Sequence, residues 1–215
     1  MAQFAVIGGS TADRWALPGV ALIYAVLVLV LPVARLRLRA GRWPIDPSRL
    51  STAQRPASAL LFAALAFYAV WSVTYFLIGP LDLGVASSGA PCRVLGWSAL
   101  LLGLAIVVTA QAQMGRSWRI GIHREQTELV TQGLFGLVRN PIYSGLILGG
   151  CGYFAVSPCI PSALAAIALA VGFGLQARAE ERHLLEVSGT EYRAYAERVG
   201  RFVPGVGRLR RALPE

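Results

Sequence analysis

Charged side chains are scarce in this sequence, and lysine is absent from it altogether. Of its 215 residues only 14% are charged and 55% are hydrophobic, whereas soluble domains carry charge on about a quarter of their residues. This composition excludes a soluble globular domain. The length allows one membrane domain of four to six helices at about 20 residues each, and it leaves no room for a separate soluble catalytic domain.

Residues that bind metals are also few. The two histidines, His123 and His183, lie far apart, and the three cysteines, Cys92, Cys151 and Cys159, form no C-x-x-C pair. We therefore expect no zinc or haem site. Cys92 and Cys159 both fall near the same predicted membrane face, so the sequence leaves a disulfide between them open.

Five apolar runs are long enough to suggest membrane spans, at residues 16–34, 57–79, 92–114, 141–156 and 162–177. The last two have 16 residues each, which corresponds to about 24 Å of helix, and only five residues separate them. They predict a short helical hairpin, in which Gly145, Gly149 and Gly152 form a face suited to close packing. We expect an all-α integral membrane protein with about five transmembrane helices and a cytosolic carboxyl-terminal helix.

The arginines indicate the orientation of these spans. All 20 basic residues are arginine, and a five-span arrangement puts 18 of them on one side of the membrane. The positive-inside rule then places the amino terminus outside and the tail in the cytoplasm. Because the arginines flank apolar runs, we expect membrane lipids and not nucleic acid as their partner. The pattern is typical of a multi-pass protein of a bacterial inner membrane.

Polar residues capable of chemistry concentrate in two segments, 115–140 and 178–202. Both are predicted to be cytoplasmic, and the ends of the hairpin, Pro141 and Ala177, bring them to one membrane surface. Pro141 suits the first turn of a helix, and the amides after it favour an anion. Glu180 would extend the last span and could accept hydrogen bonds from a diol or pair with a cation.

Two plainer interpretations of these segments stay open. Pro141 is also consistent with an ordinary helix start, with Arg139 and Tyr143 as interfacial anchors. The stretch after Arg178 is also consistent with a solvated helix in which Glu and Arg pair at three- and four-residue spacing.

Taken together, the two segments resemble a known family. The motifs Leu-Val-Thr-x-Gly-x-Phe, Val-Arg-Asn-Pro-x-Tyr-x-Gly, Glu-Glu-x-x-Leu, Gly-x-Glu-Tyr-x-x-Tyr and Arg-Phe-x-Pro follow one another between Gly115 and Pro204. Their order and spacing resemble the isoprenylcysteine carboxyl methyltransferase family of integral membrane enzymes. The resemblance implies a methyltransferase that binds S-adenosyl-L-methionine in a cytosolic pocket and receives a lipophilic or small acceptor, a carboxylate, thiol or amine, from the bilayer.

The resemblance also implies roles for individual residues. The cofactor would be held by Thr127, Glu128, Leu129, Val130, Phe135, Asn140, Pro141, Ile142, Tyr143 and Glu180. Gln176 and Arg178 would face the acceptor, and His183 and Arg178 are the candidates for a catalytic role. Two positions depart from the family: Asn140 stands where a histidine is usual, and Gln176 where enzymes acting on a prenylcysteine carboxylate carry an arginine.

These expectations divide the chain into a variable membrane region, 1–114, a cofactor-binding region, 115–204, and a basic tail, 205–215. Two other functional classes remain open. One is a sterol-reductase-like enzyme that binds NADPH, whose family has a related carboxyl-terminal membrane fold. The other is a non-catalytic membrane scaffold. A transporter would place polar residues inside its spans, and the apolar runs here contain almost none.

Overall fold

The computed structural model describes residues 11–40, 55–78, 89–114 and 129–209, and these ranges are predominantly helical. A long amino-terminal helix consists of α2 (Thr11–Tyr24), the π-helical η1 (Ala25–Val30) and α3 (Leu31–Ala40). It is followed by α4 (Arg55–Leu77), α5 (Ala90–Met114), the single turn α6 (Leu134–Leu137), α7 (Pro141–Val156) and α8 (Ile160–Arg198).

Five of these helices are apolar. Four are long enough to cross a membrane, at Asp13–Arg35, Arg55–Leu77, Ala90–Met114 and Ile160–Arg198, and α7 is a shorter apolar helix. Each of the five predicted spans corresponds to one of them. The all-α membrane fold predicted from the sequence is therefore confirmed.

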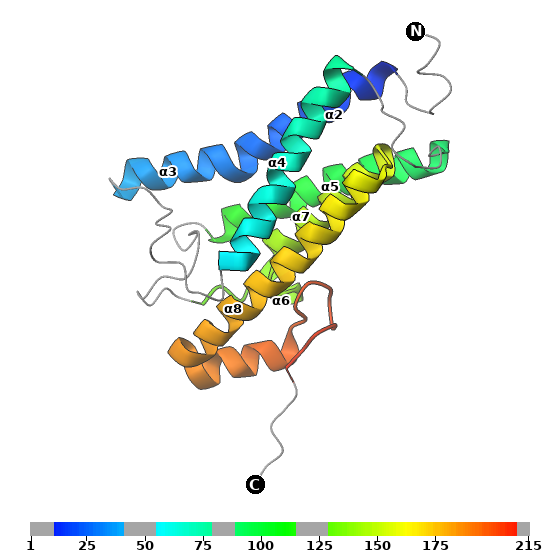
Figure 1. Ribbon diagram of the computed structural model, residues 1–215. Helices are drawn as coiled ribbons and strands as arrows, with labels where there is room; N and C mark the ends of the chain where they lie inside the picture. The colour runs from blue at the N-terminus through cyan, green and yellow to red at the C-terminus, as the bar shows by residue number, and fades with distance from the viewer. Residues whose placement is uncertain (1–10, 41–54, 79–88, 115–128, 210–215) are drawn as a thin grey trace.

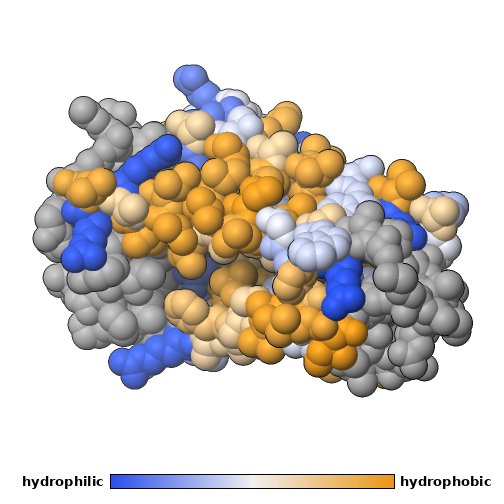
Figure 2. All heavy atoms as spheres, turned by 90° about the horizontal axis from the view of Figure 1, so that it is seen from above, coloured by the Kyte–Doolittle hydropathy of each residue, from blue (hydrophilic) through white to orange (hydrophobic). Residues whose placement is uncertain are grey.

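Apolar side chains cover much of the outer surface of these helices. Leu22, Phe62, Leu101 and Ile167, from four different spans, are all more than half exposed. In the space-filling view, apolar side chains gather across the middle of the face, and charged side chains lie mainly around them (Figure 2). Such a surface is stable in contact with lipid and would be an aggregation hazard in water.

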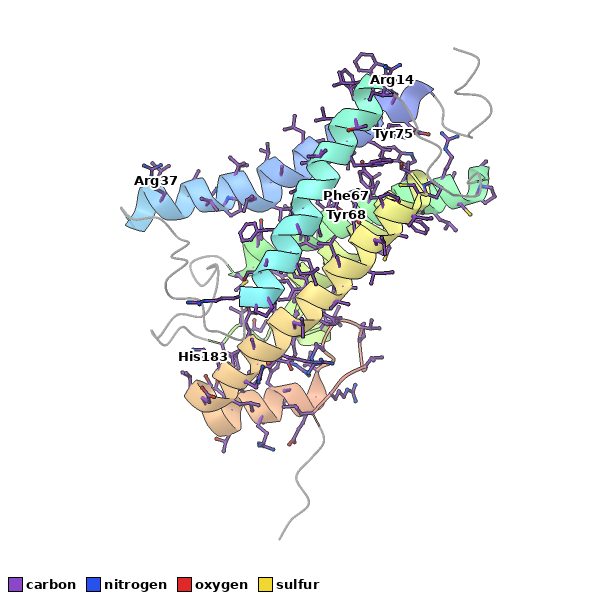
Figure 3. The ribbon with its side chains drawn as sticks, in the orientation of Figure 1. Arg14, Arg37, Phe67, Tyr68, Tyr75 and His183 are labelled. Atoms are coloured by element: carbon purple, nitrogen blue, oxygen red, sulfur yellow. The ribbon has the colours of Figure 1, made fainter. Side chains whose placement is uncertain are left out.

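Helix ends meet at two opposite ends of the bundle. We call the end that holds Arg14 and Tyr75 the outer end and the end near His183 the inner end, following the predicted orientation (Figure 3). At the outer end, the Arg14 side chain donates to the carbonyls of Phe76 and Leu77 at 2.6 and 2.8 Å, where α4 ends. At the inner end, the Leu134 amide donates to Gln113 near the end of α5 at 2.9 Å.

Arg14 and Arg93, the two arginines that do not belong to the group of 18, stabilise the outer end. Arg14 satisfies the last carbonyls of α4, and Arg93, near the start of α5, forms an ion pair with the buried carboxylate of Asp13. Trp97 also donates to Asp13. These contacts fasten the amino-terminal helix to α4 and α5.

Two helix pairs form the body of the bundle, α4 with α8 and α5 with α7 (Figure 1). The predicted glycine face of α7 is closely packed as expected, but against α5 and not against the second arm of the hairpin. A Cβ atom at Gly145 would lie 2.6 Å from the backbone oxygen of Gly103 in α5. Only glycine permits so close an approach of two helix backbones.

The helix α8 is longer than the predicted last span. It begins with Cys159 as its N-cap, whose sulfur accepts from the Ser162 amide, and it runs without interruption past Ala177. It bends at Gly189, where φ is 44° and ψ is −114°, and the short arm after the bend packs Tyr192 and Tyr195 into a small core. The predicted carboxyl-terminal helix is thus the far part of the last span's own helix.

The disulfide left open by the sequence is not formed. Cys92 is a free, exposed thiol, and Cys159 is a free, buried one. The sulfur of Cys159 lies 3.2 Å from the Ser162 hydroxyl oxygen. Cys159 therefore serves to cap α8.

Candidate functional site

The inner end brings together chain segments that are far apart in sequence. The Asn140 amide donates to the carbonyl of Arg201 at 3.1 Å, and the Ser144 hydroxyl donates to the carbonyl of Phe202 at 2.7 Å. Val138 and Gly200 form a parallel bridge. The start of α7 is thereby fixed against the segment that follows α8, as the sequence predicted for the two polar segments.

Tyr143, Gln176 and Glu180 form a cluster between α7 and α8, which we call the Glu180 cluster. The Tyr143 hydroxyl donates to Oε1 of Glu180 at 2.7 Å, and the Gln176 amide nitrogen donates to the same oxygen at 2.9 Å. The Tyr143 ring stacks on Phe173, with ring centroids 4.7 Å apart. Gln176 and Glu180 meet because residues four apart on a helix share a face.

Two oxygens of this cluster are left to accept hydrogen bonds. Both bonds to Glu180 end on Oε1, and within the described ranges no donor reaches Oε2. The side-chain oxygen of Gln176 is buried and has no partner there either. A buried polar atom without a partner costs about 1–3 kcal/mol, so the Gln176 oxygen marks a place where a donor of a ligand would be stabilised.

The neighbouring carboxylate, Glu181, is engaged in a different way. It accepts from Arg139 at 3.1 and 2.9 Å and from Arg201 at 3.0, 3.1 and 2.7 Å. The side chains of Arg139 and Glu181 are only 1% and 7% exposed. Hydrogen bonding to Glu181 raises the pKa of Arg201 above its already high usual value, so Arg201 remains charged in any practical buffer.

Arg139 also ties three stretches of backbone together. Its guanidinium donates to the carbonyls of Ala196, Val199 and Gly207. These carbonyls belong to the end of α8 and to the turn that follows it. The buried arginine therefore holds the carboxyl-terminal segment against the start of α7.

The segment before α7 borders a pocket of about 400 Å³. Its lining residues are Gln113, Leu129, Val130, Thr131, Gln132 and Gly133. Leu129 also packs against the small core of Tyr192 and Tyr195. Phe135 is buried, and its carbonyl accepts from the Tyr195 hydroxyl at 2.6 Å.

The other predicted site residues have varied surroundings. Thr127 and Glu128 lie outside the described residues. Pro141 is fully buried and Ile142 is half-buried at the start of α7, while Arg178 is exposed on α8 and His183 is half-buried one turn beyond Glu180. The geometry brings together Tyr143, Gln176 and Glu180, and it leaves Arg178 outside this group. Within the described ranges, no three His, Cys, Asp or Glu side chains are grouped closely enough to hold a metal ion.

Comparisons with known proteins match the part of the chain that contains the Glu180 cluster. The family model of the phospholipid methyltransferases matches residues 91–191. Protein-S-isoprenylcysteine O-methyltransferase B of Arabidopsis thaliana is 35% identical over 116 residues, which cover 52% of this chain and 58% of the relative. A probable protein-S-isoprenylcysteine O-methyltransferase of Oryza sativa subsp. indica is 33% identical over 115 residues, covering 51% and 60%.

The carboxyl-terminal half of this chain is therefore similar to the phospholipid methyltransferase family and to protein-S-isoprenylcysteine O-methyltransferases. A further relative, the nickel-cobalt-cadmium resistance protein NccN of Alcaligenes xylosoxydans xylosoxydans, is 34% identical over 116 residues, covering 53% of this chain and 54% of the relative. The chain thus spans between 54% and 60% of the length of these three relatives. The family match contains α7, the Glu180 cluster and most of α8.

The two positions that depart from the family have different surroundings. Asn140 caps α7 without a side-chain hydrogen bond to the helix, and its amide nitrogen lies 3.4 Å from the carbonyl of Arg201. Gln176 is part of the Glu180 cluster. Of the two substitutions, only that at Gln176 places an unpaired buried atom within the candidate site.

Sequence reasoning missed the ion network of Arg139, Glu181 and Arg201. The signal was present, since adjacent residues on a helix point about 100° apart and two consecutive acids therefore face different neighbours. Glu180 faces Gln176, and Glu181 faces Arg139 and Arg201.

Proposed function

We propose that this protein is an integral membrane methyltransferase that uses S-adenosyl-L-methionine and methylates a lipophilic or small acceptor reached from the bilayer. The observation that carries the proposal is the Glu180 cluster, which lies within the residues matched by the family and holds two oxygens without described donors. Because the chain spans little more than half of its relatives' length, their isoprenylcysteine acceptor is not carried over to it.

The residues at the inner end fit S-adenosylmethionine chemically. The cofactor carries ribose hydroxyls and amino groups, which are donors, and Oε2 of Glu180 is suited to accept from them. The amides at the start of α7 lack a side-chain cap and are suited to its carboxylate. Leu129 and Val130 border the pocket before α7, which supports their predicted contact with the cofactor. The contacts of Thr127, Glu128 and Phe135 with the cofactor are proposed from the resemblance alone.

When bound, the cofactor supplies an electrophilic methyl group on a sulfonium sulfur. The residues of the chain would position it, which alone can supply much of the acceleration in such a transfer. Tyr143 orients the Glu180 carboxylate, and the stack on Phe173 holds the Tyr143 ring in place. Glu181 and its two arginines keep α8 in register with α7.

Calorimetric titration of the purified protein in detergent tests this function. We expect saturable micromolar binding of S-adenosylhomocysteine and none of NADPH. Glu180→Gln should weaken S-adenosylhomocysteine binding about ten-fold, because an amide accepts from ligand donors less strongly than a carboxylate. Glu186→Gln, the same change at an exposed position of α8, is the matched control. Binding of NADPH instead would favour the reductase class, and binding of neither would favour a scaffold.

We also propose that the site faces the cytoplasm of a bacterial cell. The proposal is supported by the arginines, 18 of which fall on the side of the inner end in the five-span arrangement. Arg139 and Arg201 are part of that group and lie at the site itself.

A further inference from the structure

The side-chain oxygen of Gln176 is the most unusual buried atom at the inner end. Gln176 is 8% exposed, and its Oε1 has no hydrogen-bond partner among the described residues. The residue lies one helical turn closer to the start of α8 than Glu180, about 6 Å deeper toward the apolar part of the span. Gln176 therefore lies on the side of Glu180 that is nearer to the bilayer core.

The orientation of this amide is fixed by its neighbour. A carboxylate can only accept hydrogen bonds, so the amide must turn its nitrogen toward Oε1 of Glu180, at 2.9 Å. Oε1 of Gln176 then points away from Glu180 and has to be an acceptor. Tyr143 cannot satisfy it, because the Tyr143 hydroxyl donates to Glu180.

Among the residues that the structure describes, no arginine donates to the Gln176 side chain. Arg139 and Arg201 both pair with Glu181, and Arg178 is exposed on α8. A carboxylate-bearing acceptor would therefore place its oxygens against the oxygens of Gln176 and Glu180. Such a contact between acceptors discriminates strongly, because it leaves a buried charge unpaired.

We propose that Gln176 determines acceptor specificity, by selecting a methyl acceptor that carries an O–H or N–H group over one that carries a carboxylate. The donor group of the acceptor hydrogen-bonds to Oε1 of Gln176, while the Gln176 nitrogen stays on Glu180. This inference rests on the proposed methyltransferase function and concerns the chemical class of its substrate.

Three amphiphiles that differ only in their head group test the inference: dodecanol, dodecylamine and dodecanoate. Their binding to the full chain in detergent is measured by calorimetry with S-adenosylhomocysteine present, so that no turnover occurs. We expect the wild-type protein to bind dodecanol or dodecylamine at least ten-fold better than dodecanoate.

Variants at Gln176 connect this preference to the residue. Gln176→Met keeps the length of the side chain and removes the acceptor, so affinity for dodecanol should fall about ten-fold. Gln176→Arg introduces donors and should reverse the preference toward dodecanoate. Leu175→Met, at the neighbouring exposed position, should change neither value.

The outcomes separate this inference from the proposed function. If S-adenosylhomocysteine fails to bind the wild-type protein, the proposed function is wrong. Suppose that S-adenosylhomocysteine binds equally well to the wild type and to Gln176→Met. If the two proteins then rank the three amphiphiles in the same order of affinity, the role of Gln176 is overturned. A wild-type preference for dodecanoate would overturn it as well.

Discussion

Glu180 and Glu181 are consecutive residues of like charge, yet their surroundings differ completely. Glu180 accepts from two neutral donors, both on Oε1, whereas Glu181 accepts from two arginines. Buried charges persist in proteins when they are paired and hydrogen-bonded. At the scale of the residue, this difference supports the proposal that Glu180 binds a ligand and that Glu181 has a structural role.

The same substitution at the two positions should therefore affect different properties. Glu181→Gln leaves Arg139 and Arg201 without their counter-charge, and we expect it to lower the free energy of unfolding by about 3–5 kcal/mol. Glu180→Gln should leave stability almost unchanged and weaken ligand binding. Thermal unfolding in detergent, monitored by size-exclusion chromatography of heated samples, measures the loss of stability in Glu181→Gln. Equal melting temperatures for the two variants would contradict this assignment.

At the scale of the element, the close contact of α5 with α7 sets the position of the site. The backbone oxygen of Gly103 occupies the space that a Cβ atom at Gly145 would need. We expect Gly145→Ala to force the helices apart and to destabilise the protein by about 1–3 kcal/mol. The melting temperature in detergent gives the measurement. Gly174→Ala is the control, since a Cβ there meets nothing within 4 Å.

The bend of α8 depends on Gly189 for a different reason. A Cβ at Gly189 would also meet nothing within 4 Å, but its positive φ is one that other residues rarely adopt. We expect Gly189→Ala to cost about 1–3 kcal/mol of backbone strain, felt mainly in the arm that carries Tyr192 and Tyr195. Limited proteolysis should cut this arm faster in the variant. An unchanged cleavage rate would mean that the bend is set by packing alone.

At the scale of the whole molecule, the start of α2 and the Glu180 cluster lie at opposite ends of the bundle of apolar helices. We expect a fluorescent protein fused to the carboxyl terminus to fluoresce in bacterial cells, where it folds in the cytoplasm. The same protein fused to the amino terminus and exported unfolded should stay dark. The reversed pattern would contradict the orientation inferred from the arginines.

Much of this fold could be predicted from residue pattern alone. Apolar length predicts spans because the bilayer core has a fixed thickness and backbone groups must pair within each helix. The five spans and the convergence of the two polar segments followed from this reasoning, whereas the second arm of the predicted short hairpin is the much longer α8. The helix that packs against the glycine face of α7 could not be predicted in this way. A pattern of glycines shows that a helix can be approached closely, but it does not show which helix approaches it.

The sequence by itself determined the membrane class, the spans and the motifs that resemble the family, since these depend on local composition and spacing. Only the tertiary structure decided what each polar residue does. The pairing of Arg139 with Glu181 joins residues 42 positions apart, and the bond from Tyr143 to Glu180 joins residues 37 positions apart. The orientation of the Gln176 amide depends in turn on Glu180, which already accepts from Tyr143. Hydrogen bonds are directional and short, so the role of these atoms is fixed only when α7 and α8 are packed together.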